Sequence, residues 1–185
     1  MSSNRRVPRA YRGAAGAAPR GVQGGQYVAE VPSADPVVFV IGMRINRWRR
    51  IRSWWPVFTG MPRMLAELQS RDAGLLAARS YWSGRSFLVL QHWRSAEELG
   101  AYARDPSFKH ARAWGEFNKQ AAATGDVGIY HETYVVPRDR IETLYANMPA
   151  FGLAAAHGGR PRTPAAPRTS AHDRLDSTQP EYAEE

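Results

Sequence analysis

The sequence contains no cysteine, which excludes disulfide bonds and thiolate metal sites. Disulfides are rare where thiols are kept reduced, so this absence fits a cytoplasmic protein, and we expect that location. The longest apolar run, residues 36–43, is far shorter than the roughly 20 residues that a membrane-spanning helix needs. We therefore expect no membrane partner.

The sequence also lacks the short motifs of several enzyme classes. It has no nucleotide-binding glycine pattern, no nucleophile elbow, no HExxH and no paired-carboxylate motif. Dehydrogenase, kinase, serine hydrolase and zinc protease functions are therefore without support. No two histidines have ligand spacing on one helix, so no metal site is predicted, although a site built from distant histidines stays open.

The net charge of +8 is of the sign that a nucleic-acid-binding protein would show. Solvated arginines on the surface explain the same charge, and we favour this interpretation, so nucleic acid is not an expected partner.

Composition divides the chain into three parts. Residues 1–35 and 157–185 are rich in Gly, Ala, Pro, Ser, Thr and Arg, and they have no periodic apolar pattern. Such segments bury too little surface to offset their chain entropy, so we predict a disordered basic arm and a disordered tail. Residues 36–156 have the length of one ordinary domain.

The order of predicted elements indicates the fold. Residues 37–45 form a strand that is apolar on both sides, and a helical stripe follows to Leu68, with a break near residues 59–60 because Pro56 and Pro62 resist a helix interior. Strands at 75–82 and 85–93 form a hairpin through Ser83 and Gly84.

Ser95 and Glu98 form a capping box, Asp105 and Pro106 open a further helix, and a last strand covers 127–136 before a short arm at 141–153. This is the α+β, ferredoxin-like split βαβ pattern, with a four-stranded antiparallel sheet. Its helices cover one side of the sheet, so the apolar second side predicts a homodimer, that is, a dimeric α+β barrel.

Three histidines lie in the predicted domain, at positions 92, 110 and 131. Intervals of four place one of them on a helical stripe with other polar and aromatic residues: His110, Trp114 and Asn118. His131 alternates with Ile129 and Thr133 on the last strand, near Tyr130, Glu132 and Tyr134. If stripe and strand converge, His131 or, second, His110 can remove a proton from a phenolic or enolic substrate, whose carbanion then reacts with dioxygen. The alternative is a hydrogen-bonded packing role for each histidine.

A second group of candidates lies where the first strand meets its helix. Arg44 can hold a substrate carboxylate or phenolate beside Asn46, or it can pair with Glu132, and we favour the internal ion pair. Most tryptophans are expected in the core, with Trp54 and Trp114 as candidates for a pocket wall.

Five segments resemble a known family: MRINRWRRIRSWWPVFTGMPRMLAEL, FLVLQHWRSAEELGAYARD, HARAWGEFNK, VGIYHETYVV and NMPAFGLA. The family is a monooxygenase-like group of unknown function related to the fungal fumagillin-pathway monooxygenase, within the antibiotic-biosynthesis monooxygenase and dimeric α+β barrel superfamily. The resemblance covers roughly residues 36–153.

This resemblance implies a homodimer that oxidises a small aromatic or terpenoid-like molecule in secondary metabolism without a cofactor. The superfamily also contains haem enzymes and members with only a ligand-binding or structural role. A haem enzyme with an axial histidine and a non-catalytic ligand-binding dimer are therefore both open alternatives.

Overall fold

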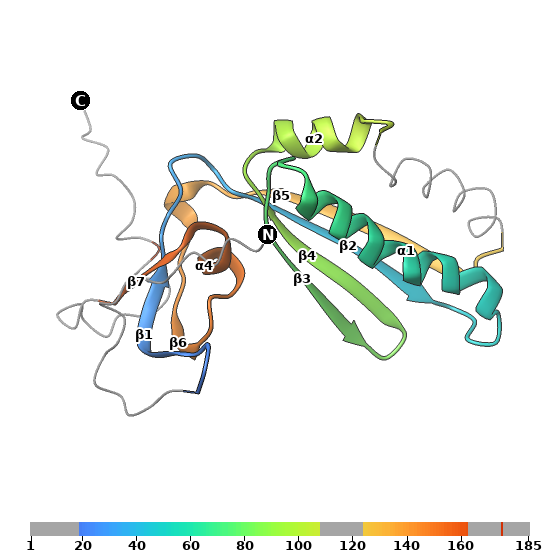
Figure 1. Cartoon of the computed structure of the whole chain (residues 1–185), viewed down its shortest axis with the longest axis horizontal. Coiled ribbons are helices and arrows are strands. Elements are labelled where there is room, and N and C mark those ends of the chain that lie inside the picture. The colour runs from blue at the N-terminus through green and yellow to red at the C-terminus, as the bar shows by residue number, and fades with distance from the viewer. Residues whose placement is uncertain (1–18, 108–123, 163–174, 176–185) are drawn as a thin grey trace. The chain divides into compact units, whose positions relative to one another are not determined.

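The computed structural model describes residues 19–107, 124–162 and 175 of the chain. It divides into two compact units. Val37–Val135 form the first, which we call the sheet unit, and Met1–Pro36 with Val136–Glu185 form the second, the terminal unit (Figure 1).

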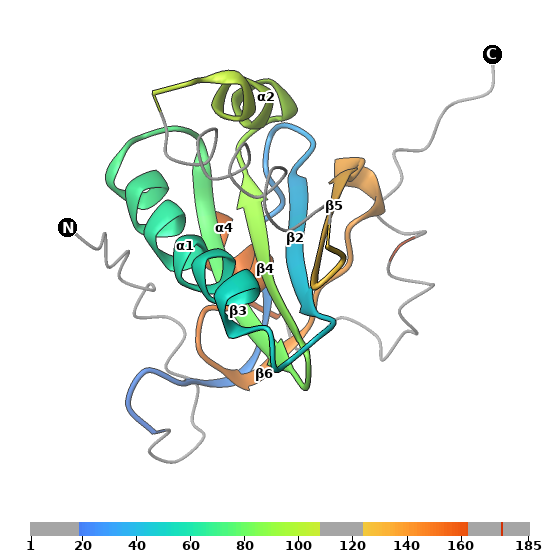
Figure 2. The same ribbon diagram turned by 90° about the vertical axis from the view of Figure 1, so that its right-hand side faces the viewer.

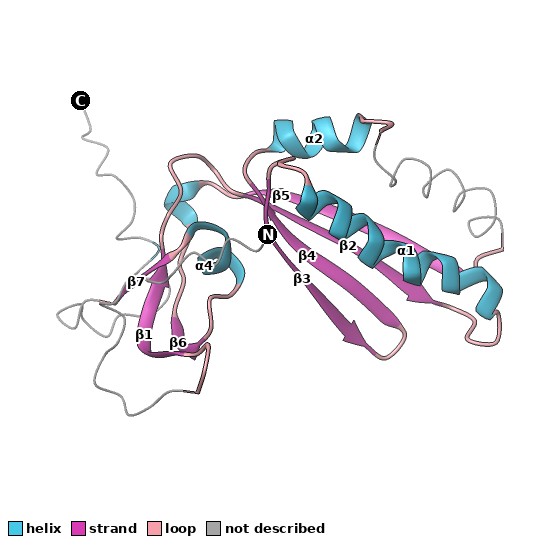
Figure 3. Cartoon of the chain, viewed as in Figure 1, coloured by secondary structure: helices cyan, strands magenta, loops and turns pink. Residues whose placement is uncertain are grey.

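The sheet unit contains a four-stranded antiparallel sheet with the strand order β3-β4-β2-β5 (Figure 3). The strands are β2 (Val37–Ile45), β3 (Leu75–Ser83), β4 (Ser86–Trp93) and β5 (Val127–Val135). Helix α1 (Ile51–Ser70) joins β2 to β3, and α2 (Ala96–Arg104) follows β4. This order confirms the predicted α+β, ferredoxin-like fold.

Both helices pack on one side of the sheet, which we call the helix-facing side (Figures 1 and 2). Leu68 of α1 and Leu99 of α2 join Val37 and Trp93 in one buried cluster. A second cluster, nearer the start of α1, contains Met43, Ile45, Trp54 and Val127. Odd-numbered residues of β2 supply this core, so its even-numbered residues point to the opposite side, the reverse face.

Helix α1 runs without interruption from Ile51 to Ser70, so the predicted break near residues 59–60 is wrong. Pro56 and Pro62 are both exposed, and the carbonyls that they leave without a donor can therefore bond to water. The Thr59 hydroxyl adds a local bond between the two prolines, because it donates to the carbonyl oxygen of Trp55 at 3.0 Å.

Local signals placed the hairpin and the cap of α2 well. Ser83 pairs with Ser86, so the turn residues are Gly84 and Arg85, one position later than predicted. Ser95 caps α2, and its Oγ accepts from the Glu98 amide at 3.2 Å, which confirms the Ser95 half of the capping box. The Glu98 carboxylate accepts from Arg94 Nη1 at 2.7 Å instead of completing the box. The predicted helix after Asp105 falls mostly on 108–123, outside the described residues.

The terminal unit contains a three-stranded sheet with the order β6-β1-β7, formed by β1 (Gln23–Ala29), β6 (Tyr145–Met148) and β7 (Gly159–Pro161). A short 3-10 helix, η2 (Arg138–Arg140), and α4 (Gly152–His157) complete it.

Strands β1 and β7 correct the prediction that 1–35 and 157–185 are disordered throughout. Tyr27 of β1 is buried, its ring stacks on Tyr145 at 4.7 Å, and its hydroxyl donates to the carbonyl oxygen of Pro149 at 2.7 Å. These partners lie more than a hundred residues away, so local composition does not reveal them.

Within the described residues, no helix combines the length and apolar character required to cross a membrane.

Candidate functional site

Two rows of side chains cross the helix-facing side of the sheet. Directly paired residues of antiparallel strands point to the same side, so the pairing defines the rows. From β5 to β3, one row is His131, Ile41, Val89 and Ser80, and the next is Thr133, Phe39, Gln91 and Ala78. The inner positions of the rows are apolar except for Gln91, and the other polar members, His131, Thr133 and Ser80, lie on the outer strands β5 and β3.

His131 stands at the β5 edge of this surface. The residue is exposed, and its ring centroid lies 5.9 Å from the ring centroid of Phe39 in the neighbouring row. An imidazole beside an aromatic ring and next to aliphatic Ile41 can meet an apolar substrate and still exchange protons with solvent.

Gln91 is the polar residue that the sequence analysis missed. It is only 7 % exposed, and its Oε1 accepts from Nε1 of the fully buried Trp93 at 2.8 Å. With its oxygen engaged, the amide NH2 is the group that remains available to donate. The available signal was a glutamine in the otherwise apolar run FLVLQ of a central strand.

The predicted partners of His131 on the helical stripe are His110, Trp114 and Asn118. All three lie outside the described residues, so their convergence with His131 stays a prediction.

Three other predicted neighbours of His131 project from the reverse face. Tyr130, Glu132 and Tyr134 alternate with His131 along β5, so the sheet separates them from it. The Tyr134 hydroxyl donates to Glu132 Oε2 at 2.7 Å, and this hydrogen bond to a carboxylate raises the pKa of Tyr134.

Tyr130 lies over the neighbouring strand at a glycine. A Cβ on Gly42 would come within 2.5 Å of Cε1 of the Tyr130 ring, so only glycine leaves room for the ring here. Tyr130 is thus fitted to the reverse face of the sheet and not to the side that carries His131.

The predicted ion pair between Arg44 and Glu132 is wrong. Arg44 Nη1 donates instead to Asn46 Oδ1 at 3.0 Å. Glu132 pairs across the strands with Val40, four residues from Arg44, which is a separation of about 13 Å along the strand. Arg44 is exposed on the reverse face, away from His131.

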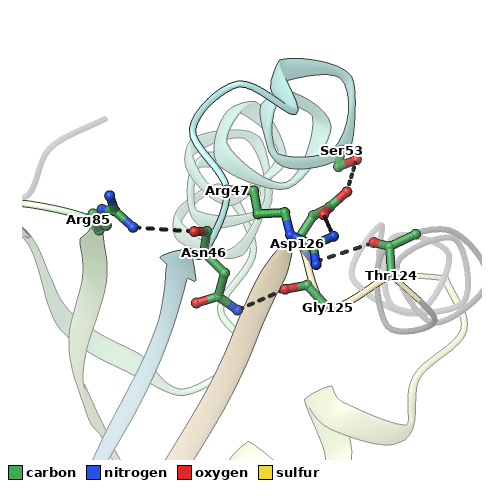
Figure 4. A network of polar contacts seen from close by, with 7 residues as sticks. All are labelled: Asn46, Arg47, Ser53, Arg85, Thr124, Gly125 and Asp126. Carbon is green, nitrogen blue, oxygen red and sulfur yellow. Dashed lines mark hydrogen bonds and ion pairs between the residues drawn. The ribbon is translucent and has the colours of Figure 1, made fainter.

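Asn46 belongs to a polar network that ties the end of β2 to the start of β5 (Figure 4). Its Nδ2 donates to the Gly125 carbonyl oxygen at 3.0 Å. The buried carboxylate of Asp126 accepts from Ser53 Oγ and from Arg47 Nη1, each at 2.9 Å. The hydrogen bond from Ser53 contributes most, and together these bonds hold the pKa of Asp126 below its usual range. The network fixes the start of α1 against the sheet.

Trp54 is a core residue in the structure. It is 9 % exposed, packs in the cluster of Met43, Ile45 and Val127, and donates through Nε1 to the Trp48 carbonyl oxygen at 3.0 Å. Its indole therefore contributes to the core beneath the start of α1.

Residues 36–153, more than half of the chain, match the family model described as monooxygenase af470-like. The chain belongs to this family. The relation to the fumagillin pathway stays a prediction, and no curated protein matches the sequence.

Solved structures similar to this monooxygenase af470-like chain include an aldoxime dehydratase, with 19% identity and a TM-score of 0.56 over 77% of this chain. The match spans 42% of the dehydratase, and at this identity it supports the fold alone.

Two smaller neighbours match at lower TM-scores. SnoaB, a cofactor-independent oxygenase from Streptomyces nogalater, has 16% identity and a TM-score of 0.36, covering 56% of this chain and 95% of its own. A Caulobacter crescentus CB15 protein proposed to be an antibiotic biosynthesis monooxygenase has 15% identity and a TM-score of 0.40, covering 56% and 92%.

The described part of this monooxygenase af470-like chain contains no cluster of three His, Asp or Glu side chains that could hold a metal ion. His131 has a different kind of setting, a single imidazole against an apolar wall. Chemically, this setting suits proton transfer with an apolar substrate, and it also suits one axial bond to a haem iron.

Proposed function

We propose that the chain is an oxygenase that oxidises a small aromatic or terpenoid-like molecule on the helix-facing side of its sheet, in secondary metabolism. The observation that carries the proposal is the exposed imidazole of His131 beside Phe39, at the β5 edge of the two rows. Membership of a monooxygenase-like family supports it.

In this proposal His131 is the general base. The substrate carries a CH2 group next to a carbonyl group or a phenol ring, and the imidazole removes one of its protons. The resulting carbanion gives electrons to dioxygen directly. One oxygen atom becomes the new carbonyl oxygen, and the other leaves as water with the two hydrogens of the CH2 group. The substrate is thus its own reductant.

The other row members bind and orient the substrate. Phe39, Ile41 and Val89 offer an apolar wall that excludes water from the carbanion. The amide NH2 of Gln91, whose oxygen is held by Trp93, donates to the enolate or phenolate oxygen as negative charge develops there. His110, Trp114 and Asn118 remain proposed members of the same site.

We also propose that a second copy of the chain covers the reverse face. Val38, Val40, Leu88 and Leu90 lie on this face, and exposed Tyr130 and Tyr134 flank them. An apolar sheet face of this kind is covered by a partner in stable proteins. In analytical ultracentrifugation the wild type should be a dimer and Val40→Asp a folded monomer. A monomeric wild type would contradict this part of the proposal.

Two measurements test the proposed chemistry against its alternatives. Oxygen uptake is followed with phenols and ketones that raise the melting temperature of the protein. Uptake supports the oxygenase, whereas tight binding without uptake favours a non-catalytic ligand-binding dimer. The visible spectrum of protein from a haem-replete host should show no Soret band, and a Soret band would replace the cofactor-free chemistry with that of a haem enzyme.

A further inference from the structure

Exposed tryptophans and arginines gather at one end of the sheet unit. At this end β2 finishes, α1 begins and β3 turns into β4, because Arg44 near the end of β2 pairs with Ser86 next to the turn. The surface here, which we call the Trp/Arg surface, consists of Trp48, Arg49, Arg50, Ile51, Arg52, Trp55 and Trp82. Its apolar members are 39 to 57 % exposed.

The aromatic rings of this surface form one connected cluster. The ring centroid of Trp48 lies 5.6 Å from that of the buried Trp54, and the centroids of Trp54 and Trp55 are 5.8 Å apart. The ring centroid of Phe58 lies 6.1 Å from that of Trp55 and 5.2 Å from that of Trp82. The exposed tryptophans are therefore the outer part of a contiguous aromatic surface, and contiguous exposed apolar surface indicates an interaction site.

The charge of this surface has one sign. No acidic residue occurs between Asp35 and Glu67, a stretch that contains six arginines. Within the described residues, no carboxylate pairs with Arg49, Arg50 or Arg52. The first turn of α1 has no acidic residue either, although arginines are unfavourable at the positive end of a helix dipole. The fold itself therefore does not account for these arginines.

We propose that the Trp/Arg surface docks on the anionic surface of a lipid bilayer. Tryptophan favours the boundary between acyl chains and headgroups, and arginine lays its aliphatic stem on apolar surface while its guanidinium binds a phosphate or carboxylate headgroup. The docking is peripheral and needs no membrane-spanning helix, but it departs from the expectation that the chain has no membrane partner. It does not depend on the proposed oxygenase chemistry.

Two other occupants fit the surface less well. A second copy of the chain would bring arginines against arginines, which is repulsive. Single-stranded nucleic acid stacks its bases on aromatic rings. Base stacking does not explain the exposure of Ile51, which is aliphatic and 57 % exposed. A bilayer accepts the isoleucine, the tryptophans and the arginines together.

The test is flotation of the full chain with vesicles of phosphatidylcholine alone or with added phosphatidylserine. The wild type should bind the anionic vesicles, and this binding should weaken as salt rises. Each arginine near an anionic surface contributes about 5-fold to binding, so Arg49→Gln with Arg52→Gln should reduce it by about 25-fold. Ile51→Ser should reduce it several-fold at high salt, where the apolar contribution dominates.

The matched control is Arg63→Gln with Arg104→Gln, which removes the same charge elsewhere. Arg63 lies about 17 Å beyond Arg52 along α1, and Arg104 ends α2, whose preceding strand β4 finishes opposite the start of β2. The control variant should bind as the wild type does.

Three results would overturn the proposal. The first is no binding to anionic vesicles at low salt. The second is an equal effect of the Arg49, Arg52 and control changes, or no effect of Ile51→Ser. The third is a loss of single-stranded oligonucleotide binding in the Arg49 and Arg52 variant while vesicle binding is unchanged, which would assign the surface to nucleic acid.

Discussion

Replacing Gln91 with leucine tests whether the buried amide is held by Trp93 as the site requires. Gln91 is 7 % and Trp93 0 % exposed, and the indole N–H donates to Oε1 of Gln91 at 2.8 Å. Leucine keeps most of the volume but removes the acceptor, so a buried donor is left without a partner. The free energy of unfolding should therefore fall by about 2 kcal/mol, within the 1–3 kcal/mol typical of such a loss.

A double-mutant cycle separates this bond from packing. Trp93→Phe removes the donor and also shrinks a fully buried side chain, so alone it should cost more than Gln91→Leu. The double variant has neither polar partner, and its loss should be smaller than the sum of the single losses by about 1–2 kcal/mol. Urea unfolding measures all four proteins, with Ser80→Ala as an exposed control on the same side of the sheet. Losses that simply add, or an unchanged midpoint for Gln91→Leu, would refute the assigned bond.

Two further predictions concern the network at the start of β5 and the reverse face. The lowered pKa of Asp126 means that its stabilising contribution is present well above the ordinary value of 3.8 and is lost as the pH falls below it. The urea midpoint of Asp126→Asn should therefore change less than that of the wild type between about pH 5 and pH 3, and parallel curves would contradict this. Gly42→Ala should destabilise the chain by about 1 kcal/mol in thermal unfolding, because the added Cβ meets the Tyr130 ring. In a Tyr130→Ala background Gly42→Ala should carry no such penalty. An equal penalty in that background would show that the ring is not the cause.

The sequence predicted the sheet unit because its signals are local. The N-cap at Ser95, a two-residue turn within one position of Ser83 and Gly84, and the alternation of β2 are each readable within ten residues. The break predicted in α1 failed because propensity does not say that Pro56 and Pro62 face solvent. Strand β1 was missed because its partners, β6 and β7, follow more than a hundred residues later.

The candidate site was predictable in part for the same reason. Strand alternation fixed the side of the sheet for His131, and applied strictly it would also have assigned Tyr130 and Glu132 to the reverse face. The Arg44 and Glu132 pair failed because the strand register, which sequence alone does not give, separates the two residues. The hydrogen bonds of Asp126 join it to residues more than seventy positions earlier in the chain, so no local sequence pattern predicts them.

The most direct test of the central claim is oxygen uptake by His131→Gln with a phenol or ketone that the wild type oxidises. Glutamine keeps a similar volume and a hydrogen-bonding end but cannot act as a base near neutral pH. Uptake should fall by about 100-fold or more while the melting temperature and ligand affinity stay close to those of the wild type. His172→Gln, in the predicted tail, is the matched control and should retain full uptake. Full uptake by a folded His131→Gln protein would contradict the assignment of His131 as the base.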